Sequence, residues 1–201
     1  MLEQAIRDAR ENDDTIRNQT FSGQELLEAD LAGLELEHVT FDHCRFDDCD
    51  FSNASFYQTR FENCDFSNCR MRKTYWNQSV ILGSKGDGVS LTESTFKRCS
   101  LLESMFHYAN LPQTLWEDTQ IRDCSFKRAS FQSAKLKRLQ LKNVILSGAE
   151  FFRCSLSGID LSECAIDGLT VSTSLTELRG AKINPGQAVD LMPLLGVEMI
   201  S

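Results

Sequence analysis

The stretch Cys44-Arg45-Phe46-Asp47-Asp48-Cys49-Asp50-Phe51 repeats one pattern at intervals of five residues, a cysteine followed two positions later by a phenylalanine. The spacing continues far beyond this stretch in both directions. From Ile16 to Val171, every fifth residue is apolar at 31 of 32 positions, and only Gly86 interrupts the series. The chain is therefore built from an internal repeat of five residues, which differs from the period of an α-helix.

A second series lies two residues before the first and holds mostly small side chains, including all eight cysteines. Five residues of α-helix rotate a side chain by about 140°, and five residues of a flat strand reverse its direction, so neither element buries both series. A chain that turns a corner every five residues does bury both, with successive coils stacked about 4.8 Å apart. The pattern predicts an all-β solenoid.

Two segments, Cys44-Arg45-Phe46-Asp47-Asp48 and Cys64-Asp65-Phe66-Ser67-Asn68, resemble the motif of the pentapeptide-repeat proteins. In that family a small residue, a polar residue, Leu or Phe and two polar residues follow one another, and four repeats form one square coil. The resemblance covers residues 16–175 and implies a right-handed quadrilateral β-helix of about eight coils. One internal column would then contain Phe56, Trp76, Phe96 and Trp116.

Both ends of the repeat carry patterns typical of short helices, which would cover the open ends of a solenoid. Residues 1–15 place apolar side chains at helical spacing and predict an N-terminal capping helix. Residues 176–201 form the expected C-terminal cap, in which Asn184-Pro185 begins a helix that Gly196 ends, with a short strand after it. The segment 188–197 is also similar to the terminus through which gyrase-protecting family members dimerise. A homodimer is expected, with contacts from Leu191, Leu194, Leu195 and Val197.

Residues 82–90 contain three glycines and place Gly86 where the repeat has a large side chain. This composition predicts a loop or a distorted corner. Family members with known targets use loops that project from the coil, so Lys85, Gly86 and Asp87 are candidate partner contacts. The alternative is a hinge between two stacks of coils.

No combination of nucleophile, base and orienting acid can be identified, so the protein is not expected to be an enzyme and no catalytic residue is assigned. The common series of the eight cysteines indicates core packing and argues against disulfides or a zinc site. The glycine-rich residues 83–88 lack the spacing of a phosphate-binding P-loop. We expect no metal site and no cofactor.

The longest apolar stretches fall far short of the roughly 20 residues that cross a bilayer, so no membrane span is expected. The first eight residues include acids where a signal peptide needs an apolar run, which predicts a cytoplasmic protein. A net charge of −8 argues against direct binding of nucleic acid, because such binding depends on Lys and Arg neutralising phosphates. A basic protein partner fits this charge.

Charge is divided along the chain. Residues 1–70 hold 16 acidic and 6 basic residues, residues 71–142 hold 6 and 12, and residues 143–201 hold 7 and 3. Columns of residues 20 apart alternate in sign in the middle segment, but Asp30 would lie over Asp50 near the N-terminus. Such like charges repel by about 0.9 kcal/mol at 4.8 Å in water, which stability does not explain. The candidate interaction surface comprises Glu28, Asp30, Asp42, Asp47, Asp48, Asp50, Glu62 and Asp65.

Two functions fit these features. The first is a DNA mimic that presents stacked carboxylates to a type II topoisomerase, either DNA gyrase or topoisomerase IV. The Cys- and Phe-rich coils and the terminal helix resemble quinolone-resistance members of the family, although the basic middle segment restricts the acidic footprint to residues 25–65. The second is a structural scaffold with an unrelated protein partner and no effect on topoisomerases.

Overall fold

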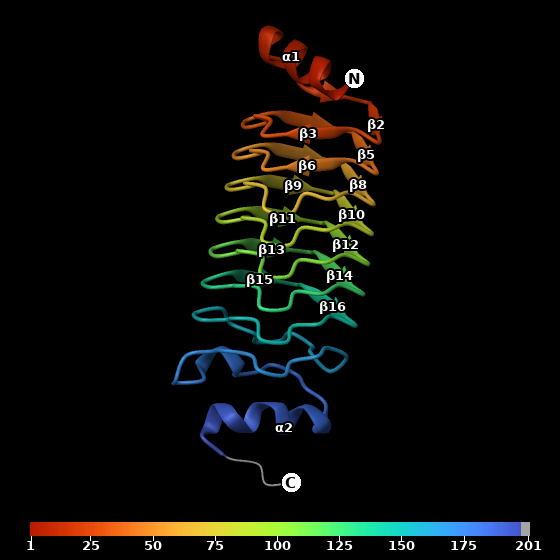
Figure 1. Ribbon diagram of the computed structural model, residues 1–201. Coiled ribbons are helices and arrows are strands. Elements are labelled where there is room, and N and C mark those ends of the chain that lie inside the picture. Colours follow the sequence, from red (N-terminus) through yellow and green to blue (C-terminus); the bar gives the residue numbers. More distant parts are fainter. Residues whose placement is uncertain (198–201) are drawn as a thin grey trace.

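The structure is a computed structural model that describes residues 1–197, so most of the strand expected after Gly196 lies outside the described residues. The chain winds around one axis to form a rod with helices at both ends (Figure 1). Helix α1 (Leu2–Asn12) covers the N-terminal end. The C-terminal end carries η1 (Thr176–Leu178), η2 (Pro185–Gln187), α2 (Ala188–Leu191) and η3 (Met192–Leu195).

Three sides of the rod carry parallel sheets, and every pairing joins residues 20 apart, as Phe41 with Phe61. The predicted solenoid with square coils of 20 residues is confirmed. The first sheet contains β1 (Ile16–Arg17), β4 (Glu35–Glu37), β7 (Ser55–Tyr57), β9 (Tyr75–Asn77), β11 (Thr95–Lys97), β13 (Leu115–Glu117) and β15 (Lys135–Lys137). The second contains β2 (Thr20–Ser22), β5 (Thr40–Asp42), β8 (Arg60–Glu62), β10 (Val80–Leu82), β12 (Ser100–Leu102), β14 (Gln120–Arg122) and β16 (Gln140–Lys142). The third pairs β3 (Glu25–Leu27) with β6 (Arg45–Asp47).

The fourth side is held by isolated bridges, from Asp30 with Asp50 to Glu150 with Thr170. The seven-stranded sheets span about six turns, slightly fewer than the predicted eight. Beyond Lys142 the chain continues to coil, but bridges replace strands there.

The inward series forms the core, as the period predicted. Along one column, Phe56, Trp76, Phe96 and Trp116 stack with ring centroids 4.0, 5.5 and 4.2 Å apart. Each indole N–H donates to the threonine two residues earlier, at 2.9 Å in both cases, so the buried tryptophans leave no polar atom unpaired. The series of small residues thus supplies hydrogen-bond acceptors as well as space.

All eight cysteines are buried and free. Burial raises the pKa of Cys99 and Cys124 to about 11. Because the thiolate is the reactive form, Cys99 and Cys124 act as small core residues.

The prediction of a loop at residues 82–90 was wrong. The backbone of Lys85 forms parallel β-bridges with Asp65 and Met105, and the amide of Gly86 donates to the carbonyl of Met105 at 2.8 Å. This segment is therefore a regular part of the coil. Lys85, Gly86 and Asp87 therefore do not project from the coil as partner contacts on a loop.

The rings of neighbouring turns explain how the coil tolerates Gly86. Phe66 and Phe106 approach each other across the glycine, with ring centroids 6.1 Å apart although they are two turns apart in the sequence. A Cβ atom on Gly86 would lie 2.5 Å from Cε2 of Phe66. The two rings therefore occupy the space that a large side chain fills in other repeats.

The C-terminal cap has the predicted ends. The Asn184 side chain accepts from the amide of Gln187 at 3.1 Å, Pro185 occupies the first turn, and Gly196 ends the last helix with a φ of 73°. The expected single helix is divided into three short segments, the last of which has Pro193 in its first turn. Buried Gln187 donates to the carbonyls of Leu161 and Cys164 at 2.7 and 2.6 Å, which fixes the cap on the last turn.

Among the described residues, no helix combines the length and the apolar character that a bilayer crossing requires.

Gly86→Ala should lower the free energy of unfolding by about 1–3 kcal/mol, because the added methyl group overpacks the space between the two rings. Phe66→Leu combined with Gly86→Ala should cost less than the two single changes together, since the smaller side chain makes room for the methyl group. Urea unfolding followed by tryptophan fluorescence measures all three variants. Strictly additive losses would show that the Phe66 ring does not fill the position.

Candidate protein-interaction surface

The eight predicted acidic residues lie on three neighbouring sides of the first turns and do not form one patch. Asp42 on β5 pairs in register with Glu62 on β8, on the second side. Asp47, on β6, and Asp65 belong to the third side. The remaining four gather on the fourth side and the corner before it, namely Glu28, Asp30, Asp48 and Asp50.

Arginines offset the like charges on the fourth side. The backbones of Asp30 and Asp50 form a parallel β-bridge, so the two residues are stacked as expected. Arg70, however, donates to the carboxylate of Asp50 at 3.2 Å and to that of Asp48 at 3.1 Å. Arg10, from α1, lies 2.9 Å from the Asp30 carboxylate. The expectation that these columns repel without compensation was therefore wrong, because each end of the stacked aspartate pair contacts a guanidinium.

The pair on the second side is also partnered. Asp42 accepts from the Ser22 hydroxyl at 3.0 Å and lies 2.6 Å from Nδ1 of His43. The hydrogen bond from Ser22, followed by that from His43, lowers the pKa of Asp42, so this carboxyl is ionised at neutral pH. Glu62 forms an ion pair of 2.6 Å with Arg60.

These contacts leave the segment strongly acidic, because residues 1–70 hold 16 acidic residues against 6 basic ones. Within residues 1–197, neither Glu28 nor Asp65 forms an ion pair, and the same holds for Glu25. All three lie on the third side or at its corner. This side therefore presents carboxylates that no cation of the described chain neutralises in an ion pair.

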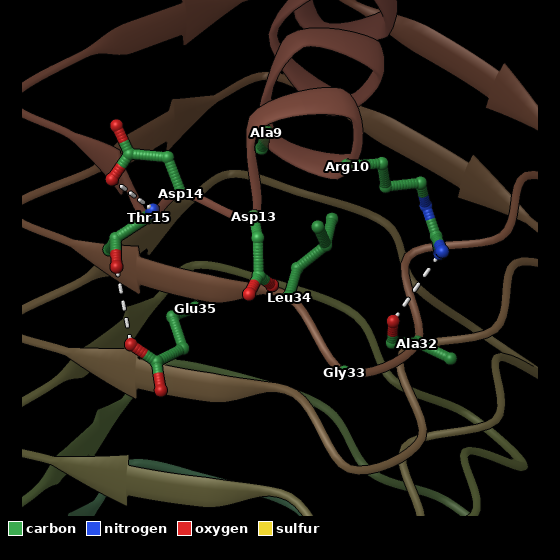
Figure 2. Close-up of a pocket in the computed structure, with 9 residues that line it drawn as sticks. All are labelled: Ala9, Arg10, Asp13, Asp14, Thr15, Ala32, Gly33, Leu34 and Glu35. Atoms are coloured by element: carbon green, nitrogen blue, oxygen red, sulfur yellow. Dashed lines mark hydrogen bonds between the residues drawn. The ribbon is translucent and has the colours of Figure 1, made fainter.

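A groove that sequence reasoning missed lies between α1 and the first two turns (Figure 2). Its volume is about 460 Å³, and Asp13, Asp14 and Glu35 line it together with Arg10. The Thr15 hydroxyl donates to Glu35 at 3.2 Å across the turns. The only sequence signal was the adjacent acid pair after the helix, since the groove depends on how α1 docks. The groove extends the acidic surface towards the end of the rod.

The four predicted dimer residues separate into two pairs. Leu191 and Leu194 pack against the core and serve the cap. Leu195 and Val197 are 59% and 44% exposed, as is Val189 beside them at 51%. Only the second pair is available to another subunit.

Across residues 1–197, the structure contains no cluster of three or more His, Cys, Asp or Glu side chains that could hold a metal ion.

Two family models, both of pentapeptide repeats, match parts of the chain. The family described as pentapeptide repeats (9 copies) matches residues 36–76, and that described as pentapeptide repeats (8 copies) matches residues 117–148 and 129–165. No curated protein matches the chain.

One solved structure supports the fold, and a second pentapeptide repeat protein matches more weakly. A trypsin-treated variant of QnrB1, described as a plasmid-mediated fluoroquinolone resistance protein, is 20% identical with a TM-score of 0.55, and the match covers 92% of this chain and 97% of that one. HetL, a pentapeptide repeat protein involved in heterocyst differentiation regulation from the cyanobacterium Nostoc sp. strain PCC 7120, is 17% identical with a TM-score of 0.33, over 83% and 86% of the two chains. At these identities the likeness to QnrB1 supports the fold alone.

Arg70→Gln should raise the pKa of Asp50. Burial alone would raise this pKa, but hydrogen bonds from Ser52 and then from Arg70 outweigh burial and hold it below its usual value. A lowered carboxyl pKa stabilises the fold above the pKa of the unfolded chain, and this stabilisation is lost as the pH falls through the folded value. The variant should therefore lose part of it at neutral pH. Carboxyl ¹³C chemical shifts followed against pH measure the change.

Arg72→Gln is the matched control, because Arg72 forms no ion pair within the part of the chain that the structure describes. The pKa of Asp50 should stay close to that of the unaltered protein in this variant. Equal shifts in the two variants would mean that general charge, and not the Arg70 contact, sets the pKa.

Proposed function

Since this chain belongs to the pentapeptide-repeat proteins, we propose that it acts as a rigid, non-enzymatic protein-interaction rod. The stacked turns hold surface side chains at fixed spacing, which suits recognition of an extended complementary surface. The proposal includes a cytoplasmic location, since a reducing compartment fits eight free, buried cysteines.

The proposed partner is a type II topoisomerase, DNA gyrase or topoisomerase IV, bound through DNA mimicry. The observation that carries this choice is the linear charge density. Residues 16–70 hold 11 acidic and 4 basic residues over a length of about 13 Å at the spacing of stacked strands. One net negative charge therefore falls on about every 1.9 Å of the rod, close to the 1.7 Å of duplex DNA. The description of QnrB1 as a fluoroquinolone resistance protein adds support for this class of partner.

The rod carries this charge only near one end, because residues 71–142 hold 6 acidic and 12 basic residues. A basic groove would therefore contact the first turns and the groove below α1, and not the whole rod. Binding of this kind depends on opposite charges across the interface, so it should weaken as salt is added.

Neutralising four acids should weaken binding to gyrase while leaving the coil folded. Because Asp48 and Asp50 also contact Arg70, stability should stay equal or fall slightly. Binding to immobilised gyrase over a salt series, together with inhibition of supercoiling, measures the effect. The variant combines Asp42→Asn, Asp48→Asn, Asp50→Asn and Glu62→Gln.

The matched control removes four acids from the C-terminal part of the rod and should bind gyrase as the unaltered protein does. It combines Glu150→Gln, Asp160→Asn, Glu163→Gln and Asp167→Asn. Equal binding by the two variants, or no salt-dependent binding by the unaltered protein, would reject the topoisomerase. The rod would then serve as a scaffold for an unrelated partner.

The proposed rod is a homodimer joined at its C-terminal end. Val189, Leu195 and Val197 expose apolar surface there that the cap itself does not bury. Leu195→Asp should give monomers in sedimentation velocity without lowering the unfolding temperature, because its side chain does not pack against the core. An unaltered protein that already sediments as a monomer would show that these residues only finish the cap.

A further inference from the structure

The backbone ladder of the solenoid stops on two sides of one turn. In earlier turns the amides of Asp118 and Asp123 donate to the carbonyls of Lys137 and Lys142, both at 3.0 Å. The equivalent amides one turn later belong to Arg138 and Asn143. In the described part of the chain, neither donates to a backbone carbonyl of the next turn. Figure 1 shows the arrows of both sheets ending at β15 and β16.

The next turn bonds to the C-terminal cap instead. The amide of Leu156 donates to the carbonyl of Glu177, and that of Leu161 to the carbonyl of Lys182, each at 2.8 Å. On the other two sides the ladder continues across the same interval, as shown by the bond of 3.0 Å from the Ala165 amide to the Val144 carbonyl and by that of 2.8 Å from the Phe151 amide to the Thr170 carbonyl. The turns thus stay hydrogen-bonded on two sides and lack these backbone bonds on the other two, which leaves an open edge formed by β15 and β16.

Side-chain burial follows the backbone. Leu136 and Leu141, the inward residues of these strands, are only partly buried, whereas every other inward residue from Ile16 to Val171 is buried. Behind them the interior is closed, since the apolar cavity there measures about 10 Å³ and is too small for more than one water molecule. The opening is therefore a strand edge with two half-exposed leucines, and not a hole in the core.

The edge is strongly basic. Residues 135–142 carry three lysines and one arginine and contain no acid. Arg138 and Lys137 pair with acids of the turn before, but Lys135 and Lys142 form no ion pair among the residues that the structure describes. Lysines on an exposed edge discourage pairing with other neutral edges, and the same charges favour an acidic strand.

We propose that the open edge formed by β15 and β16 binds an acidic segment of a partner protein, which bends at the corner between the two strands and adds one short strand to each sheet. The backbone of the segment accepts from the amides of Arg138 and Asn143, and its carboxylates pair with Lys135 and Lys142. Its apolar side chains cover Leu136 and Leu141. A protein segment fits better than nucleic acid, because only a polypeptide backbone continues the ladder. This basic edge lies apart from the acidic surface and would take a partner of opposite charge.

The probe is a fluorescently labelled peptide of nine residues that alternates Glu and Val. Fluorescence anisotropy should show saturable binding. The same peptide with N-methyl groups on alternate residues keeps the charge but loses backbone donors on one edge and gains bulk there, so strand pairing should weaken by about tenfold or more. Equal affinity for the two peptides would overturn the proposal.

Two matched variants locate the site. Lys135→Gln with Lys142→Gln should weaken binding of the peptide about fivefold, because two exposed charge contacts are removed. Arg72→Gln with Lys127→Gln removes the same charge elsewhere and should leave binding unchanged. All four side chains are exposed, so both variants should melt like the unaltered protein. Equal weakening in the two variants would overturn the proposed site.

Hydrogen exchange tests the backbone directly. In the free protein the amides of Arg138 and Asn143 should exchange faster than those of Asp118 and Asp123, and the peptide should slow the first pair. Unchanged exchange at Arg138 and Asn143 with the peptide bound would reject strand pairing. Displacement of the peptide by single-stranded oligothymidylate of equal length, at equal concentration, would assign the edge to nucleic acid and overturn the proposal.

Discussion

A parallel backbone ladder that pairs residues 20 apart holds the turns of this rod together, and the other features depend on it. The register of this parallel ladder places Phe41 over Phe61 and Trp76 over Phe96, so the inward series packs as continuous columns. A shift of one residue would bring charged side chains such as Asp42 into the core, which fixes the register strongly. The same register aligns outward residues in columns, and therefore decides which charges meet.

Alignment alone does not decide whether a column repels. Asp50 lies between Asp30 on one turn and Arg70 on the next, so the sign changes within the column. Arg70 could have been found from the sequence, because it lies 20 residues after Asp50. Arg10 could not, since it reaches Asp30 from α1, whose position on the first turn does not follow from the repeat. The acidity of this end therefore rests on the excess of acids over bases and not on uncompensated pairs.

The period of five was sufficient to predict the solenoid, its core and the free cysteines, because each repeat makes the same contacts. The period of five gave wrong predictions where the local structure depends on contacts between neighbouring turns. At Gly86 the pattern lacks a large residue, yet Phe66 and Phe106 meet across the position and the coil continues. At β15 and β16 the sequence predicts a continuous coil, because Leu136 and Leu141 keep the apolar pattern, but the structure lacks the backbone hydrogen bonds to the next turn there. Neither outcome is visible in a single repeat, because each depends on contacts between turns.

The missing backbone bonds at β15 and β16 are associated with the C-terminal cap, whose carbonyls accept from the amides of the turn that contains Leu156. The buried side chain of Glu177 accepts from the amide of Arg153 at 2.9 Å and from the Ser172 hydroxyl at 2.7 Å. Burial alone would raise the pKa of Glu177, but these hydrogen bonds outweigh it and lower the pKa, so the carboxylate is ionised at neutral pH. An ionised, buried carboxylate is costly to leave without its donors, which holds this segment against the turn. The unpaired backbone edge and the exposed apolar end therefore both involve one non-repeating segment, whereas the charge of the edge comes from residues 135–142.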